Sequence, residues 1–313
     1  MTVSSAVIAV GVDGSPPSYE ALYWAADEAA ARGCGLRLIH AAYLPTLTGH
    51  EARTLSTATN QALISAGRHV LAEATSALRQ QTPNIPVASE VRWGKPADVL
   101  AEPGADAVMV VVGDRGRGGF ASLLLGSTSL RTAMRATCPV AVVRRSRQTD
   151  PADDIGRGRV VVGVDGSDRS AAAAMLAFEE AAVHNAGVNA VHVTAAPPNE
   201  VSATVGWGEQ ERTDGEKLLD EATAAARCAY PDVTFDYTVV IGNPAATLID
   251  QSVGARLTVV GTRGRDGFTG LLLGSVSQTL LHHASCPVLV TGGHLSEDQP
   301  AVGSRPATEG ETA

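Results

Sequence analysis

The chain has 313 residues, of which 44% are hydrophobic but only 4% aromatic, and its formal net charge at pH 7 is −9. This length suits two domains of about 150 residues, and an aliphatic core with few aromatic rings is typical of parallel sheets covered by helices on both faces. The acidic balance argues against nucleic acid or an anionic membrane as a partner, and no apolar run approaches the roughly 20 residues that span a bilayer.

Strands and helices alternate along the first half of the chain. Short β-branched or apolar runs predict strands at 7–12, 36–40, 85–91, 107–112 and 140–143. Helical spacing predicts helices at 16–32, from about 55 to 80, at 97–102 and at 127–136. Strands separated by helices favour right-handed crossovers and a parallel sheet.

The second half repeats this order. We therefore predict an α/β protein of two repeated doubly wound domains, each a five-stranded parallel sheet of order 3-2-1-4-5 with helices on both faces. The predicted domains are 1–146 and 159–291, joined by a polar linker at 147–158. Residues 292–313 are rich in Gly, Pro, Ser, Thr and Glu and are predicted to be a disordered tail. The first apolar run matches an internal strand rather than a signal core, so a cytoplasmic location is expected.

One loop pattern occurs twice. Residues 113–129 and 261–277 are identical at twelve of seventeen positions, and both follow the spacing Gly-x2-Gly-x9-Gly-Ser between a predicted strand and a predicted helix. Glycines let backbone N–H groups approach phosphate oxygens, and a helix start offers free N–H groups and the positive end of its dipole. The sequence thus predicts two phosphate-binding loops, formed by Gly113, Gly116, Gly126 and Ser127 in the first copy and by Gly261, Gly264, Gly274 and Ser275 in the second.

A second repeated block places a carboxylate beside each loop. The sequence Val-Gly-Val-Asp-Gly-Ser stands at 10–15 and again at 162–167, so Asp13 and Asp165 end the first strand of each domain. Strands 1 and 4 are neighbours at the topological switch point, where ligands of doubly wound sheets bind. Each aspartate is expected to face the pocket of its loop, where it suits a sugar hydroxyl, a bound Mg²⁺ or a backbone cap better than direct phosphate contact.

With these motifs the chain resembles the universal stress protein family, in its tandem-domain, ATP-binding form, over roughly residues 4–145 and 157–291. The resemblance implies one adenine nucleotide, ATP, in each domain, with Mg²⁺ entering through the nucleotide. It implies further phosphate contacts at Ser129 and Ser277, and adenine held through backbone groups at Ala41 and Val193. The implied role is regulation of stress adaptation or growth through an unknown effector protein, with slow or no ATP turnover.

The last strand of each domain predicts how the two domains meet. Residues 140–143 and 288–290 are apolar and would lie at sheet edges, where unpaired strands invite pairing. In the family this strand mediates dimerisation, which implies a pseudo-dimer within the chain. The sequence leaves open whether whole chains also pair as a homodimer.

The sequence leaves two other function classes open. An ATP-hydrolysing enzyme of the same nucleotide-binding superfamily is the main alternative, but the sequence has neither a Ser-Gly-Gly-x-Asp-Ser loop nor a His-x-Gly-His motif after strand 1. The absence of Gly-x4-Gly-Lys-Ser/Thr and of a Gly-x-Gly-x2-Gly loop after strand 1 argues against a P-loop ATPase and a nicotinamide enzyme. A partner-binding module with no ligand is the other alternative, and the close identity of the two loops argues against it.

For several residues near the loops the sequence allows more than one role. Asp114 and Asp266 each add a carboxylate to one loop, where it would weaken phosphate binding or recruit Mg²⁺. His40 and His192, at equivalent strand ends, are expected to be packed or hydrogen-bonded rather than catalytic bases. Arginines beside the glycines would either clamp phosphate or lie in solvent, and the four cysteines are expected to be buried, unreactive thiols. The arginines are Arg115, Arg117, Arg263 and Arg265.

Overall fold

A computed structural model describes residues 6–44, 57–116, 125–144, 158–194, 207–264 and 273–292. The predicted linker and tail lie outside these residues, apart from Gly158 and Gly292. Parts of the two glycine loops, 117–124 and 265–272, also lie outside them, and with these segments Arg117, Arg265 and Asp266.

Each copy alternates strands and helices as predicted. The first copy consists of β1 (Val7–Gly11), α1 (Pro16–Arg32), β2 (Gly35–Ala42), α2 (Thr57–Gln81), β3 (Val87–Trp93), α3 (Pro96–Ala101), β4 (Ala107–Gly113), α4 (Ser127–Arg135) and β5 (Val140–Val143). The second consists of β6 (Val160–Gly163), α5 (Asp168–Val183), β7 (Val188–Thr194), α6 (Trp207–Ala229), β8 (Phe235–Ile241), α7 (Pro244–Gln251), β9 (Leu257–Val260), α8 (Ser275–His283) and β10 (Val288–Val290).

The third strand begins two residues later than the sequence predicts. Pro86 has no N–H group to donate to a ladder, and its carbonyl accepts the first bond from Leu36 N at 2.8 Å. The strand therefore starts at Val87 and runs on to Trp93.

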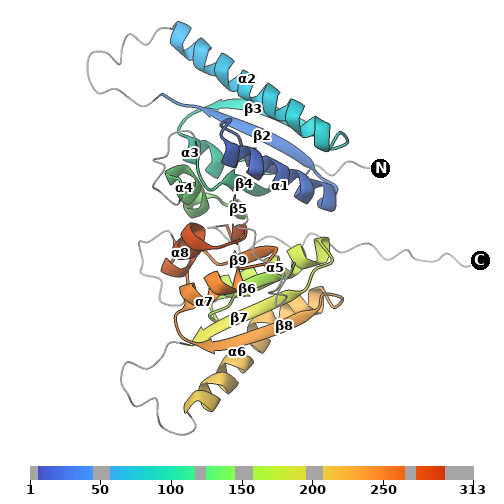
Figure 1. Cartoon of the computed structure of the whole chain (residues 1–313), viewed down its shortest axis with the longest axis vertical. Coiled ribbons are helices and arrows are strands. Elements are labelled where there is room, and N and C mark those ends of the chain that lie inside the picture. Colours follow the sequence, from blue (N-terminus) through green and yellow to red (C-terminus); the bar gives the residue numbers. More distant parts are fainter. Residues whose placement is uncertain are drawn as a thin grey trace, which may run out of the picture.

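The two copies join into one ten-stranded sheet of order β3-β2-β1-β4-β5-β10-β9-β6-β7-β8 (Figure 1). Within each copy the pairs are parallel, which confirms the predicted order 3-2-1-4-5. At the junction β5 and β10 run antiparallel, with Leu289 opposite Ala141. The edge strands of the two copies thus pair with each other, which confirms the predicted intrachain pseudo-dimer.

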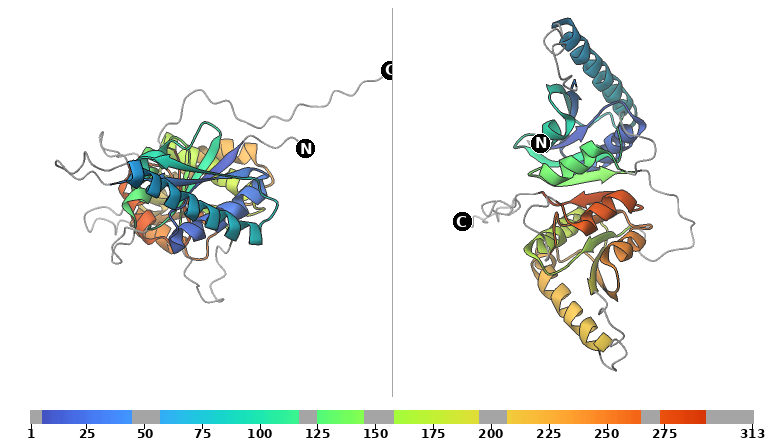
Figure 2. Two further views of the ribbon diagram at one scale, coloured as in Figure 1. Left: turned by 90° about the horizontal axis from the view of Figure 1, so that it is seen from above. Right: turned by 90° about the vertical axis from the view of Figure 1, so that its left-hand side faces the viewer.

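Two hydrophobic layers cover the sheet, one on each face. Successive side chains of a strand point to opposite faces, so Ile8 and Val10 pack in one layer and Ala9 in the other. One layer joins α1 and α2 of the first copy to α5 and α6 of the second, and the other joins α3 and α4 to α7 and α8. The copies are stacked end to end, with α2 and α6 farthest from the junction (Figures 1 and 2). Each core therefore continues across the junction.

The cysteines depart in part from expectation. Cys34 and Cys286 are buried, and burial raises the pKa of both thiols. Cys138 is partly buried, whereas Cys228 on α6 is exposed. The prediction of a buried thiol was wrong for Cys228 because its helix face points to solvent.

Candidate functional site

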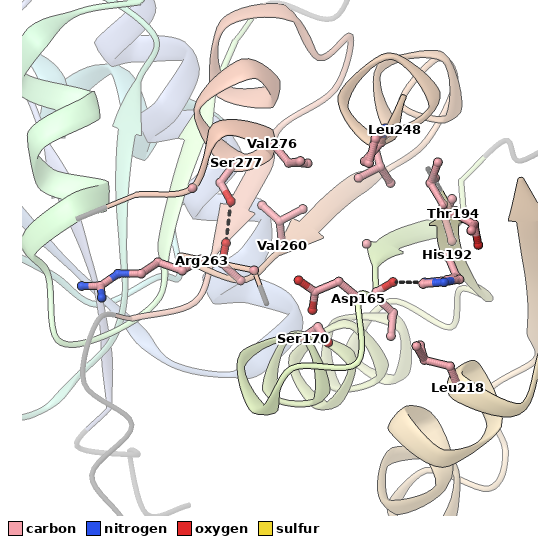
Figure 3. Close-up of a pocket in the computed structure, with 18 of the residues that line it drawn as sticks. Asp165, Ser170, His192, Thr194, Leu218, Leu248, Val260, Arg263, Val276 and Ser277 are labelled. Atoms are coloured by element: carbon pink, nitrogen blue, oxygen red, sulfur yellow. Dashed lines mark hydrogen bonds between the residues drawn. The ribbon is translucent and has the colours of Figure 1, made fainter. Parts of the chain in front are cut away.

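A cavity of about 820 Å³ lies in the second copy, at the carboxyl ends of its central strands. It is bordered by β6, β7 and β9, by the starts of α7 and α8, and by α6 (Figure 3). All seven residues that the sequence predicts for this copy line it, although they come from four separate segments: Asp165, Val193, Gly261, Gly264, Gly274, Ser275 and Ser277.

The aspartate at the end of β6 is held in a fixed pose. Its Oδ1 accepts hydrogen bonds from the backbone N–H of Ser167 at 3.0 Å and from the Ser167 hydroxyl at 2.6 Å. Its Oδ2 would lie only 2.4 Å from a Cβ placed on Gly264, too close for any side chain there. The loop glycine is therefore required by its contact with Asp165. One oxygen of Asp165 therefore caps a backbone N–H group, which is one of the three roles expected for this residue.

The start of α8 presents backbone donors to the cavity. The first intrahelical bond runs from Gln278 N–H to Gly274 O at 2.9 Å, so helix geometry leaves the amides of residues 275–277 without intrahelical acceptors. The positive end of the helix dipole lies at the same place. An anion can be bound here without any basic side chain.

Ser277 has a structural bond in addition to its place in the cavity wall. Its hydroxyl donates to the carbonyl of Gly261 at 2.6 Å (Figure 3), and the residue is 4% exposed. In the first copy the Ser129 hydroxyl donates to Gly113 O at the same distance. Each serine thus ties its helix to the glycine that opens the loop.

The strand-end histidines are oriented by the backbone, as expected. His192 Nδ1 lies 2.8 Å from Val164 O, and because a carbonyl only accepts, Nδ1 carries the proton. A Cβ on Gly215 of α6 would come within 3.0 Å of the His192 ring, so the helix packs against it through a glycine. The first copy has the same arrangement in His40 and Gly67.

Of the four arginines beside the glycines, the structure describes Arg115 and Arg263, and Arg263 lines the cavity. The Arg263 side chain extends away from Asp165 (Figure 3), and its Nε is buried without a hydrogen-bond partner among the described residues. In the first copy, Arg115 Nε lies 3.8 Å from the carboxylate of Asp114. The position of Asp114 is taken in the second copy by Thr262, whose hydroxyl accepts a bond from Arg169 at 2.7 Å.

Sequence reasoning missed the contribution of α6. Glu211 and Asp214 line the cavity and, with Asp165, give it three carboxylates. Their positions relative to the cavity follow from how the long crossover helix packs. The one local indication is Gly215, a glycine inside a helix.

The first copy brings its aspartate and its loop residues together with similar contacts. A Cβ on Gly116 would lie 2.5 Å from Asp13 Oδ2, and one on Gly126 would lie 3.7 Å from Ser129 Oγ. Gly126 N–H donates to Asp114 O at 2.7 Å, which folds the end of the loop back onto its start, and Ser127 begins α4. Ala41 lies at the carboxyl end of β2, one residue after His40.

The fold defines a tandem doubly wound α/β protein in which each half places an aspartate, a glycine loop and a helix start close together. The sequence model of the universal stress protein family matches residues 6–144 and 156–292. The chain belongs to this family.

Relatives and solved structures agree with the assignment. The universal stress protein Rv2005c of Mycobacterium tuberculosis is 36% identical over 292 residues, which cover 90% of this chain and 96% of the relative. A second M. tuberculosis relative, Rv2623, is 33% identical over 296 residues, covering 94% of this chain and 98% of the relative. A universal stress protein of Archaeoglobus fulgidus has a TM-score of 0.65 at 17% identity and covers 92% of this chain and 97% of its own, which shows the shared fold.

None of the helices, within the residues that the structure describes, is long and apolar enough to cross a membrane.

Proposed function

We propose that this protein is an ATP-binding regulator of stress adaptation or growth state that holds one adenine nucleotide in each domain. The observation that carries the proposal is the convergence on one cavity of all seven residues predicted for the second copy. These residues are separated by more than 100 positions in the sequence. A ligand site requires such distant residues to line one cavity.

Polar and apolar groups are distributed around the cavity as a nucleotide would require. Its anion-binding end lies at the start of α8, and its other end is bordered by β7 and α6. Apolar side chains such as Leu218, Leu248 and Val260 line the space between (Figure 3), suited to a base and sugar. Its volume of about 820 Å³ is within the usual range for small-molecule sites.

The charges of the lining support Mg²⁺ as a companion of the nucleotide. Asp165, Glu211 and Asp214 would repel a free polyphosphate, and a divalent cation carried with it offsets that repulsion. Asp165 Oδ1 is bound in the turn that follows β6. The other oxygen faces the glycine loop, where phosphates would lie.

Slow or absent turnover is part of the proposal. Two hydroxyl groups of the lining already donate to backbone carbonyls, Ser170 to Ser167 O at 2.8 Å and Ser277 to Gly261 O at 2.6 Å. A nucleophilic hydroxyl would instead donate to a side-chain base. We assign neither hydroxyl as a nucleophile, and the proposal favours binding over ATP hydrolysis.

The proposal includes a cytoplasmic location, where ATP is available, and an effector protein that reads the nucleotide-bound form. The paired copies form a unit with two sites, and pairing of whole chains into a homodimer would add further sites without changing either.

The test is to purify the chain without added nucleotide, denature it, and identify and count the released small molecules by chromatography and mass. Nearly two ATP per chain are expected, falling to one in Gly116→Asp or Gly264→Asp and to none in the double variant. Released ADP or AMP would favour the hydrolase. An empty protein that gives no heat with Mg²⁺-ATP in calorimetry would refute the proposal.

A further inference from the structure

One arginine of the first copy holds a helix of the second. Arg144 follows β5, and its guanidinium donates from Nη1 to His282 O at 2.9 Å and to Ala284 O at 3.1 Å, and from Nη2 to Leu281 O at 2.9 Å. These carbonyls end α8, where the helix has no further N–H groups to satisfy them. A fixed positive charge at a helix C-terminus also complements its dipole.

The other end of the same helix forms the anion-binding wall of the second cavity. Helix α8 has only nine residues, so its two ends are about 13 Å apart. Ser275, Val276 and Ser277 face the cavity, and Ser277 is bonded to the loop glycine Gly261. A helix this short depends on contacts at its ends for its position.

The junction is asymmetric at this point. In the antiparallel pair Val140 lies opposite Val290 and Val142 lies opposite Val288, so Val140 and Val288 are equivalent positions of the two copies. Counting four residues on from each, Gly292 is the equivalent of Arg144. A Cβ on Gly292 would lie 2.3 Å from Thr137 O, just after α4. Glycine at 292 therefore packs its backbone against the end of α4, and this position supplies no guanidinium to the first copy's helix.

We propose that Arg144 is a positioning residue for the second nucleotide site only, so that this site is completed by a residue of the first copy. The inference rests on the proposed function, because it concerns the affinity of that site. Loss of the guanidinium leaves three carbonyls of α8 without their donors and loosens the last turn. The N-terminal amides then lose their alignment toward the anion.

The experiment measures each site alone in the full chain. Gly116→Asp silences the first site and Gly264→Asp the second, and Mg²⁺-ATP is titrated by calorimetry at fixed salt with and without Arg144→Ala. We expect Arg144→Ala to weaken the second site by about 5- to 20-fold and to change the first by less than about 2-fold. Arg79→Ala, which removes an exposed arginine from the last turn of α2, is the control and should alter neither site.

A second measurement does not depend on nucleotide. Amide hydrogen exchange of residues 278–283 should be faster in Arg144→Ala than in the parent chain, while β6 and β9 keep their protection. An unchanged second site, or equal weakening of both sites, would overturn the inference. If the parent chain binds no ATP, the proposed function fails with it, and the exchange data still decide whether Arg144 holds the helix.

Discussion

Replacement of Glu180 by Gln should stabilise the protein above neutral pH. Glu180 and Glu28 are equivalent residues of α5 and α1, and they meet at the junction of the copies, 0% and 2% exposed. Arg32 donates to one oxygen of each carboxylate, at 2.6 Å and 2.9 Å, and His184 Nε2 donates to the other oxygen of Glu28 at 2.7 Å. The second oxygen of Glu180 is buried, and no described residue donates to it.

The two carboxyl groups have opposite pKa shifts. Burial, opposed in part by Arg32 and reinforced by the charge of Glu28, raises the pKa of Glu180 from 4.5 to about 9. Burial also acts to raise the pKa of Glu28, but hydrogen bonds from His184 and with Glu180, together with nearby positive charge, lower it to about 2. The pair therefore holds one proton at neutral pH, mainly on Glu180.

The raised pKa makes Glu180 a source of instability at high pH. A group whose pKa is higher in the folded state contributes most below its unfolded value, here near 4.5, and that contribution is lost as the pH rises toward 9. Each pH unit in this window costs up to about 1.4 kcal/mol. The proton is shared with Glu28, which makes the dependence on pH less steep than this limit. We therefore expect the free energy of unfolding to fall by about 2–3 kcal/mol between pH 5 and pH 8.

Glutamine has the shape of the protonated acid and does not titrate. Glu180→Gln should therefore match the parent chain near pH 5 and be more stable by about 2–3 kcal/mol at pH 8, which corresponds to a rise in melting temperature of about 4–8 °C. The assay is thermal and urea unfolding at both pH values. Glu28→Gln is the matched control of opposite sign, because a lowered pKa stabilises above 4.5, so this variant should be destabilised at pH 8. If Glu180→Gln shows the parent's pH dependence, or loses stability at pH 8, the assignment of the proton to Glu180 is wrong.

Two further predictions concern the site and its scaffold. Gly264→Ala places a Cβ 2.4 Å from the carboxylate of Asp165. In calorimetry it should weaken Mg²⁺-ATP binding at the second site at least about 10-fold. The control is Gly242→Ala, whose Cβ meets nothing within 4 Å and which should leave binding unchanged. Ser167→Ala removes the N-cap of α5, whose hydroxyl accepts from Ser170 N at 3.2 Å, whereas Ser15 makes no such side-chain cap for α1. In urea unfolding, Ser167→Ala should lower the free energy of unfolding by about 1 kcal/mol more than Ser15→Ala does. Equal losses in the two variants would contradict the role of the cap.

The sheet order and the two glycine loops could be predicted because each leaves a local pattern in the sequence. Alternation of apolar runs with helical segments fixes parallel crossovers, and a glycine that must lie beside Asp165 or Asp13 appears in the sequence as a fixed spacing. The pairing of β5 with β10 was predictable for a related reason, since an apolar edge strand requires a partner.

Other features are decided only by the tertiary structure. Glu28 and Arg32 on α1 lie about 150 positions from Glu180 and His184 at the end of α5, and nothing local indicates that these residues meet in a buried ion network. The bonds of Arg144 to α8 and the approach of Glu211 and Asp214 to the cavity likewise depend on how rigid elements dock. Local sequence patterns determine which elements form and which backbone positions must lack a side chain. Long-range packing determines which charged groups share a low-dielectric space, because burial and partner distance are properties of the assembled copies.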